Sequence, residues 1–369
     1  MGLYLGSTKI PAISFYKSGA IMPSGIFNIP STSGTYDVTS YAFAQGDFGY
    51  GRLSERISGD ITEYSDSTAS KIAMWAFGGT GISSISFPAC TEIGSQAFTY
   101  CSNLSTASFS ACTKILGSAF QCCYNLTEVN FPVCTAIDWY AFQSCSKLTT
   151  VSFPLCTSIN ASAFASCIGL VSINFSALSS LSGYMAFYGC TSLTSISFPS
   201  LKYLSGGYNF YYCTKLSQVY LPECIRIDGN QAFYYCPKLE SVSLPKCTYL
   251  STGAFSYCEK LSNVSLPLCE TLSNQVFCQC SILSVLSLPK CTFIGSGTFQ
   301  SCYNLLSLYL TNSVVCSLSN INAFNSTPIS TYTTSTGGVY GSIYVPTSLV
   351  AAYKSATNWA TYSDRIVGV

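Results

Sequence analysis

The stretch that decides the fold is LTTVSFPLCTSINASAFASC, residues 148–167. Its recurring parts, in chain order, are Val151, Phe153, Pro154, Ile159, Phe164 and Cys167. Apolar residues alternating with small polar ones are typical of a strand with one buried face, and proline ends such a strand because it cannot donate to a ladder. A unit this short cannot bury its apolar face alone, so we expect it to stack on copies of itself.

Copies of this unit recur along most of the chain. The phenylalanine at position 164 has equivalents 21–25 residues apart, which we call the marker phenylalanines: 77, 98, 120, 142, 164, 187, 210, 233, 255, 277, 299 and 324. A strand pattern L-x-x-V-x-F/L-P precedes most of them, eleven times between Ile82 and Leu310. This period lies in the leucine-rich-repeat range, so the sequence predicts one solenoid of about 11–12 coils with one strand per coil in a parallel sheet.

A second apolar column lies five residues before most markers, at Ile72, Ile93, Ile115, Ile137, Ile159, Leu250, Leu272 and Ile294. In the three 23-residue repeats it is displaced by one residue, to Leu181, Leu204 and Ile227. The extra residue must therefore lie between this column and the marker. The sequence predicts a bulge there, near Gly183, Gly206 to Gly207, and Gly229.

Composition excludes several classes of function. Only 8% of residues are charged, the net charge is +1, and no basic stripe exists, which argues against nucleic-acid binding. The chain has no histidine, and its 15 acidic residues are scattered singly. Histidine is the commonest general base and metal ligand, so we expect no enzyme, no metal and no cofactor. The first residues lack a secretory pattern and no apolar run is long enough for a transmembrane helix, so we expect folding in the cytosol.

The two ends depart from the repeat. Residues 1–52 predict a small β module, with strands at 3–5, 10–15 and 35–39 and a linker at 47–52. After the last marker we expect a loop at 326–341, a strand at 342–345 and a helix at 346–356 with one apolar face formed by Leu349, Ala352, Tyr353 and Ala356. The expected domains are 1–52 for attachment, 53–327 for the solenoid and 328–369 for a cap.

The unit L-x-x-V-x-L-P-x-C-T-x-I-x-x-x-A-F-x-x-C resembles the BspA-type leucine-rich repeat over about residues 53–327. The flanking segments YLGSTKI, GTYDVT and GSIYVPTSLVAAYKSATNWATYSDRI resemble tail or surface proteins of phages and prophages of gut Firmicutes. The repeat implies a fold shared by many adhesins and host-binding proteins, and it supplies no catalytic residue. The flanks imply a virion protein, which lysis would release without a signal peptide.

Of the 21 cysteines, 18 fall in two columns. One column lies three residues after the marker, at Cys101, Cys123, Cys145, Cys167, Cys190, Cys213, Cys236, Cys258, Cys280 and Cys302. The other follows the strand, at Cys90, Cys112, Cys134, Cys156, Cys224, Cys247, Cys269 and Cys291. The cysteines could instead form disulfides or metal sites. However, the Cβ vectors of equivalent cysteines in adjacent coils are parallel, which keeps the Cβ atoms too far apart for a disulfide. Zinc needs paired or clustered cysteines rather than a line of single ones, so a ladder of buried thiols is favoured. Cys122, Cys278 and Cys316 lie off both columns and are the candidate reactive thiols.

Two surfaces could hold a ligand. The solvent face of the sheet is small and polar, with residues such as Asn130 and Ser152. The turn after the marker is rich in tyrosine in the middle coils, at Tyr188, Tyr211, Tyr212, Tyr234, Tyr235 and Tyr257, and Tyr184 and Tyr208 lie beside the inserted residue. Tyr220, an exception on the solvent face of the sheet, completes the candidate patch. Tyrosine is enriched in binding surfaces, although these rings could instead pack on neighbouring coils.

The sequence thus predicts a non-enzymatic phage tail-tip or fibre protein that binds a host-surface glycan or protein through its solenoid. Its N-terminal module would contact other virion proteins, and the chain could form a homotrimer. The alternatives are a structural or decoration protein of the virion, whose solenoid mediates assembly, and a bacterial cell-surface adhesin. A hydrolase with scattered carboxylates is the remaining class.

Overall fold

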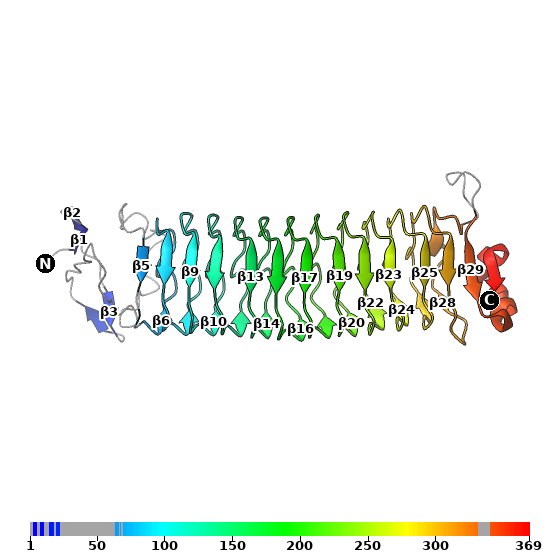
Figure 1. Cartoon of the computed structure of the whole chain (residues 1–369), viewed down its shortest axis with the longest axis horizontal. Coiled ribbons are helices and arrows are strands. Elements are labelled where there is room, and N and C mark those ends of the chain that lie inside the picture. The colour runs from blue at the N-terminus through cyan, green and yellow to red at the C-terminus, as the bar shows by residue number, and fades with distance from the viewer. Residues whose placement is uncertain are drawn as a thin grey trace. The chain divides into compact units, whose positions relative to one another are not determined.

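The computed structural model describes the backbone of residues 3–5, 8–10, 15–17 and 20–22, and residues 63–65, 67, 69–330 and 340–369. The chain divides into two compact units, residues 1–170 and 171–369, which are described separately. Both are built from short parallel strands that follow one another coil after coil (Figure 1). In the described part of the chain, no helix is long and apolar enough to cross a membrane.

In the first unit each coil contributes a three-residue strand and a two-residue strand. The longer strands are β5 (Glu63–Ser65), β7 (Ser84–Ser86), β9 (Thr106–Ser108), β11 (Glu128–Asn130) and β13 (Thr150–Ser152). The shorter strands are β6 (Lys71–Ile72), β8 (Glu92–Ile93), β10 (Lys114–Ile115), β12 (Ala136–Ile137) and β14 (Ser158–Ile159). The longer strands β5, β7, β9 and β11 pair in parallel. The five shorter strands form a second parallel sheet.

The second unit repeats this arrangement. Its longer strands are β15 (Ser172–Asn174), β17 (Ser195–Ser197), β19 (Gln218–Tyr220), β21 (Ser241–Ser243), β23 (Asn263–Ser265), β25 (Val285–Ser287), β27 (Ser307–Tyr309), β29 (Ser342–Val345) and β30 (Ile366–Gly368). The shorter strands are β16 (Ser180–Leu181), β18 (Tyr203–Leu204), β20 (Arg226–Ile227), β22 (Tyr249–Leu250), β24 (Thr271–Leu272), β26 (Phe293–Ile294) and β28 (Ser317–Leu318), and they form one seven-stranded sheet.

The predicted apolar columns form the core, and equivalent residues lie in register. Ile115 pairs with Ile93 and Ile137, and all three are at most 1% exposed. The marker phenylalanines stack face to face: Phe142 lies 5.2 Å from Phe120 and 5.1 Å from Phe164, with rings nearly parallel. The parallel β-solenoid is therefore confirmed. The second sheet was not predicted, because two-residue strands are too short for alternation to reveal them.

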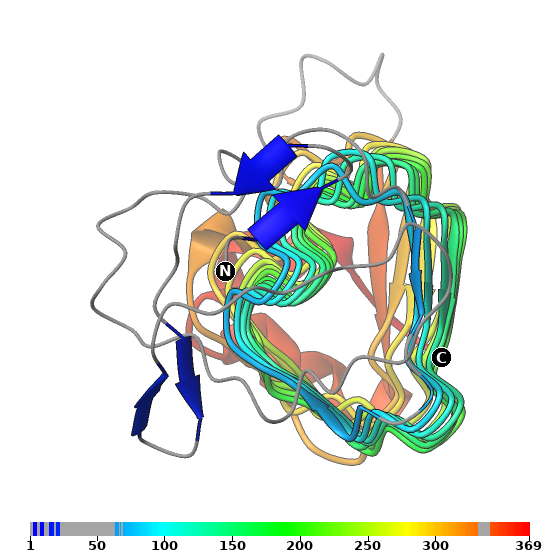
Figure 2. The same cartoon turned by 90° about the vertical axis from the view of Figure 1, so that its left-hand side faces the viewer.

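A third side of each coil holds no strand but is still bonded to the next coil. In this turn the N–H groups of Gln96, Phe98 and Tyr100 donate to carbonyls one coil later, at 2.7–2.9 Å. Residues two before and two after the marker have positive φ, for example Gln96 and Tyr100 at 58° each. This alternation turns every second N–H toward the next coil (Figure 2 shows the coils end-on). Most of these positions hold residues other than glycine, so the sequence gives no local sign of the turn.

The bulge of the 23-residue repeats lies where the sequence predicts it. In a 22-residue coil one N–H, that of Leu116, bonds to the carbonyl of Ile93 at 3.0 Å. In the bulged coil both Ser205 and Gly206 donate to the carbonyl of Leu181, at 3.0 Å each. Asp228 and Gly229 share the carbonyl of Leu204 in the same way, at 2.9 and 3.0 Å. The extra residue is thus absorbed before the marker, and the phenylalanine stack continues unbroken through Phe187, Phe210 and Phe233.

Replacing Gly229 by alanine is expected to destabilise the second unit by about 3 kcal/mol, because overpacking against rigid groups costs this much. A Cβ at residue 229 would overlap the carbonyl oxygen of Gly206, which belongs to the backbone and cannot rotate away. Gly207→Ala is the matched control, since its Cβ would meet the Tyr184 ring at 3.3 Å. Urea unfolding followed by circular dichroism compares the two variants; equal midpoints would show that the glycine column is not tightly packed.

The β module predicted for residues 1–52 can be compared with the structure only at four short strands. The strand at 3–5 is confirmed as β1 (Leu3–Leu5). Of the predicted strand at 10–15, Ile10 lies in β2 (Thr8–Ile10) and Phe15 in β3 (Phe15–Lys17), while residues 11–14 lie outside the described residues. Strand β2 pairs antiparallel with β1, and this places Thr8 opposite Leu5 in a strand rather than in a turn. Strand β3 pairs likewise with β4 (Ala20–Met22). The predicted strand at 35–39 and linker at 47–52 lie outside the described residues.

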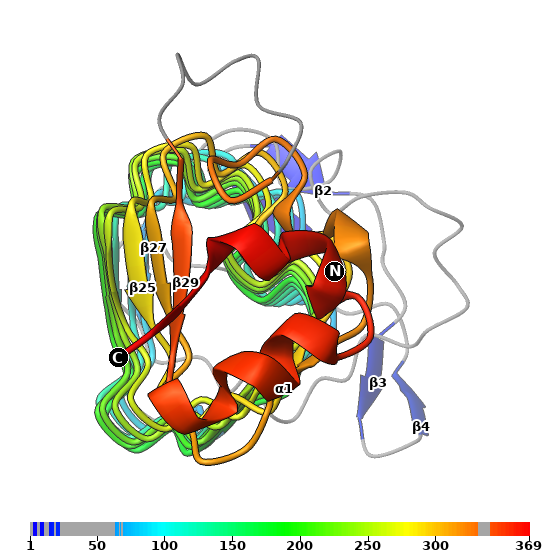
Figure 3. The same cartoon turned by 90° about the vertical axis from the view of Figure 1, so that its right-hand side faces the viewer.

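The C-terminal cap forms largely as predicted. After β29 come a 3-10 turn (η3, Thr347–Leu349) and a short helix α1 (Val350–Ser355), followed by η4 (Trp359–Arg365) and β30 (Figure 3). Tyr353 and Trp359 are fully buried, and the cap covers the last marker, Phe324, with Trp359 at 5.9 Å. The predicted four-residue apolar face is wrong, since Ala352 is exposed. Leu349 lies in η3 and Ala356 follows α1 in extended backbone, so the periodicity of one α-helix does not hold across the four residues. Strand β30, which was not predicted, extends the sheet.

Candidate binding surface

Eight of the nine candidate tyrosines form one continuous stack, which we call the tyrosine ladder: Tyr184, Tyr188, Tyr208, Tyr211, Tyr212, Tyr234, Tyr235 and Tyr257. Residues one after the marker make its central column, where Tyr211 lies 5.4 Å from Tyr188 and 4.8 Å from Tyr234. Residues two after the marker make a second column, with 4.5 Å between Tyr212 and Tyr235. The ladder exists because the coil pitch equals the stacking distance of aromatic rings.

Some rings of the tyrosine ladder are exposed to solvent, and others are half-buried. Tyr184 and Tyr212 are 47% and 39% exposed, while Tyr211 and Tyr234 are half-buried between their neighbours. Burial raises the pKa of Tyr234 to about 12 and, to a smaller extent, that of Tyr211, so both hydroxyls keep their protons at neutral pH. The surface therefore presents aromatic faces together with hydroxyl donors and acceptors.

Tyr220 is the exception among the candidates. It lies on β19, on the outer face of the longer-strand sheet, where it is 59% exposed. The structure therefore does not bring Tyr220 into the turn that carries the ladder. Small polar residues predicted for the solvent face are exposed in each unit, Asn130 and Ser152 in the first and Asn263 in the second.

Sequence reasoning missed a row of larger side chains on the seven-stranded sheet. Tyr203, Arg226 and Tyr249 pair in register on β18, β20 and β22, with their side chains outward. The Arg226 guanidinium lies 4.3 Å from the centre of the Tyr249 ring, and it donates to both carboxylate oxygens of Asp228, one of them at 2.7 Å. The sequence could have predicted this row. Each of the three residues directly precedes a residue of the second apolar column, and successive side chains of a strand point to opposite faces, so each must point to solvent.

The 21 cysteines are free and buried, which confirms the ladder of thiols over disulfides. Their role goes beyond filling space. Nine of the ten thiols of the column after the marker donate to the marker carbonyl of the preceding coil, for example Cys145 Sγ to Phe120 O at 3.1 Å. Thiols of the other column bond two residues ahead, as Cys156 Sγ does to Ser158 O at 3.3 Å. The first column thus adds a second hydrogen bond to marker carbonyls that already accept from a backbone N–H, as Phe120 O does from Cys123 at 3.2 Å.

The three off-column cysteines differ from one another. Cys122 and Cys278 retain 8% and 7% exposure, whereas Cys316 is fully buried. The Cys316 thiol lies 3.7 Å from the Cys291 sulfur, and this contact together with burial raises its pKa. A raised pKa and full burial both oppose reactivity, so Cys316 is a poor candidate. Within the described residues, no group of three or more cysteines and acids is placed to hold a metal ion.

Several solved bacterial structures are similar to this chain. A leucine-rich repeat protein from Bacteroides ovatus is 21% identical, with 82% of this chain and 88% of that chain covered and a TM-score of 0.44. A leucine rich cell surface protein from Faecalibacterium prausnitzii is 20% identical, with coverages of 83% and 91% and a TM-score of 0.42. The T. pallidum leucine rich repeat protein is 23% identical, with coverages of 69% and 86% and a TM-score of 0.34.

A search of curated proteins finds no match. The family model described as the BspA type leucine rich repeat region, in six copies, matches residues 61–149, 135–246 and 226–339. These ranges include every coil with paired strands up to β28, and their repeat unit is the one that builds the apolar columns and the thiol ladder. The chain therefore belongs to the BspA-type leucine-rich repeat family.

Proposed function

We propose that this chain is a non-enzymatic binding protein that recognises a bacterial-surface glycan or protein through the tyrosine ladder. The observation that carries the proposal is the stacking of eight tyrosines from four successive coils into one surface. Tyrosine offers large, amphipathic contact area at low entropic cost, and residues already stacked lose little further freedom on binding.

The geometry of the ladder favours an extended ligand. Rows of rings repeat at each coil, 4.5–5.4 Å apart, so the same contact can be made several times along the solenoid. A polysaccharide or an extended polypeptide offers a matching repeat of apolar faces and polar groups. Several weak contacts made together then give useful affinity without a deep pocket.

The flanking segments support a setting in a phage virion, where the solenoid would meet the host surface. In that setting residues 1–52 would bind other virion proteins, the chain could assemble as a homotrimer, and release by lysis would need no signal peptide. The same ladder would serve a bacterial cell-surface adhesin equally well. The proposal requires no cofactor, no nucleic acid and no membrane insertion in either setting.

The second candidate function is assembly, in which the ladder binds a copy of this chain or another structural protein. The observation in its favour is the low surface charge, with 8% charged residues in the chain, which does little to keep copies apart. Tyrosine is also enriched in protein interfaces. Self-association that depends on the ladder therefore separates this function from host binding.

The test is binding of the fluorescently labelled full chain to a panel of intact gut Firmicutes strains. The double variant Tyr211→Ala, Tyr234→Ala removes the centre of the ladder and is expected to weaken binding at least tenfold, since central aromatic contacts each contribute about 2 kcal/mol. Tyr220→Ala is the matched control, because this tyrosine is more exposed yet lies on β19, away from the turn that carries the ladder, and the variant should bind like the unmodified chain.

Sedimentation of the same proteins completes the test. If the unmodified chain binds no strain, and instead self-associates with a concentration dependence that the double variant abolishes, the ladder is an assembly interface. If the double variant binds cells as well as the unmodified chain does, the ligand lies elsewhere. Circular dichroism of each variant separates loss of binding from loss of folding.

A further inference from the structure

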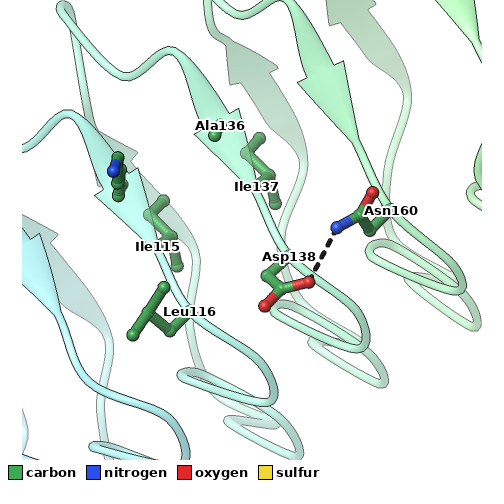
Figure 4. Close-up of a pocket in the computed structure, with 7 residues that line it drawn as sticks. Ile115, Leu116, Ala136, Ile137, Asp138 and Asn160 are labelled. Atoms are coloured by element: carbon green, nitrogen blue, oxygen red, sulfur yellow. Dashed lines mark hydrogen bonds between the residues drawn. The ribbon is translucent and has the colours of Figure 1, made fainter.

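A shallow pocket lies on the first unit, well separated in sequence from the tyrosine ladder. It has a volume of about 200 Å³ and is lined by Lys114, Ile115, Leu116, Ala136, Ile137, Asp138 and Asn160, which come from three successive coils (Figure 4). The accessible apolar part of the lining comes from Leu116 and Ala136, since the Ile115 and Ile137 side chains are buried in the core, while Lys114, Asp138 and Asn160 supply polar groups. All of these residues belong to the unit 1–170.

An exposed tryptophan borders this pocket. Trp139 follows Asp138, and its indole lies flat against Gly117, the neighbour of Leu116: a Cβ at residue 117 would be 2.5–2.9 Å from three indole atoms. Although its indole packs against Gly117, Trp139 remains 44% exposed. The Tyr140 ring stands perpendicular to it, at 5.7 Å and 90°, and is 37% exposed. The indole is thus held in place from below while its remaining surface faces solvent.

The polar groups at the rim are also fixed. The Asp138 carboxylate oxygen Oδ1 accepts from the Asn160 side-chain amide at 2.8 Å and from the Trp139 backbone N–H at 2.8 Å (Figure 4). Both contacts use the same oxygen, so Oδ2 is left to accept from a ligand. Lys114 is exposed on β10 and brings a positive charge that balances the carboxylate.

We propose that this pocket is a sugar-binding subsite that takes a neutral pyranose. An indole face packs against the C–H face of a pyranose ring, the Asp138 carboxylate accepts from ring hydroxyls, and the Lys114 ammonium and Asn160 amide donate to ring oxygens. The opposite charges of Asp138 and Lys114 cancel, which favours a neutral sugar over an acidic one. The site uses no residue of the ladder, so it stands independently of the function proposed above.

The test is titration of the full chain with methyl β-D-glucopyranoside, methyl β-D-galactopyranoside, methyl α-D-mannopyranoside and N-acetylglucosamine, followed by tryptophan fluorescence and saturation-transfer NMR. At least one sugar is expected to bind and to change the indole emission. Trp139→Ala should weaken that binding at least tenfold, as expected for loss of a central aromatic contact. Gly117→Ala should also weaken it, because the new Cβ displaces the indole without removing any polar group.

Trp75→Ala is the matched control, since Trp75 is 45% exposed in the same unit but lies against Gly78, whereas Trp139 lies against Gly117 beside the lining residue Leu116, and Trp75→Ala should leave binding unchanged. The proposal is overturned if none of the four sugars binds, or if Trp139→Ala binds them as the unmodified chain does. The double variant Tyr211→Ala, Tyr234→Ala should retain sugar binding here, so failure of this site and failure of the ladder give different results.

Discussion

Between about pH 9 and pH 10 the chain is expected to unfold, because its buried thiols can be deprotonated only in the unfolded state. Burial raises the pKa of Cys112 to about 12 and that of Cys156 to about 11, against an ordinary value of 9.0. Above pH 9 the unfolded chain therefore releases protons that the folded chain retains. The free energy of unfolding must then fall as the pH rises, and it is unaffected well below pH 9.

The effect is large because the thiols act together. In residues 69–170 eight cysteines have a raised pKa: Cys90, Cys101, Cys112, Cys123, Cys134, Cys145, Cys156 and Cys167. Each contributes about 1.4 kcal/mol per pH unit, so eight together lower the free energy of unfolding by about 11 kcal/mol per unit. A domain is typically stable by about 5–15 kcal/mol, so one unit of pH removes most of it.

Urea unfolding at a series of pH values in the presence of a reductant measures this slope. The double variant Cys123→Ala, Cys145→Ala should reduce the slope by about 3 kcal/mol per pH unit, because two titrating thiols are gone. Its stability at pH 7 also falls, since both thiols donate to marker carbonyls, but the slope is independent of that loss. A chain that stays folded at pH 12, or a slope unchanged in the variant, would contradict the role given to the thiol columns.

Replacing Phe142 by alanine is the second large effect, expected to destabilise the first unit by about 3–5 kcal/mol. The ring is fully buried and stacks on both Phe120 and Phe164, at 5.2 and 5.1 Å. It also packs edge-on against Phe131, at 6.1 Å. Neighbouring coils hold one another through the backbone ladders, so they cannot collapse into the space that the ring leaves.

Thermal and urea unfolding of Phe142→Ala, followed by circular dichroism, measures this loss. Tyr100→Ala is the control, since this ring lies in an equivalent turn but is 55% exposed, and the change should be within about 0.5 kcal/mol. Similar losses in the two variants would mean that the phenylalanine stack adds no more stability than a surface ring.

The features that recur in every coil could be predicted from the sequence. A position that is buried in each coil holds an apolar residue in each repeat, and this recurrence is visible in the sequence. Ile159, Phe164 and Cys167 could be assigned to the interior since their equivalents recur at one spacing, and the bulge followed from counting between Leu204 and Phe210. The turn conformation could not be predicted: Ser144 and Tyr212 adopt positive φ, although neither is the glycine that usually marks it. Their backbone is fixed by hydrogen bonds between coils, which no single repeat encodes.

Surface sites were predicted only where one column carries them. The tyrosine ladder could be found because Tyr188, Tyr211 and Tyr234 occupy the same place in successive repeats. The strand position of Tyr220 assigns it to the solvent face of the sheet, and the structure places it there, on β19, rather than in the ladder. The pocket beside Trp139 was missed because Asp138 and Asn160 lie 22 residues apart in the chain and meet only when coils stack.

Footprinting of tyrosine side chains tests the central claim most directly. The full chain, alone and bound to cells of a strain that it recognises, is treated with a tyrosine-nitrating reagent, and modified residues are read by mass spectrometry. Protection on binding is expected at Tyr184 and Tyr212, the most exposed members of the ladder, while Tyr220 and Tyr100 react equally in both states. Unchanged modification of Tyr184 and Tyr212 in the bound chain would contradict the ladder as the binding surface.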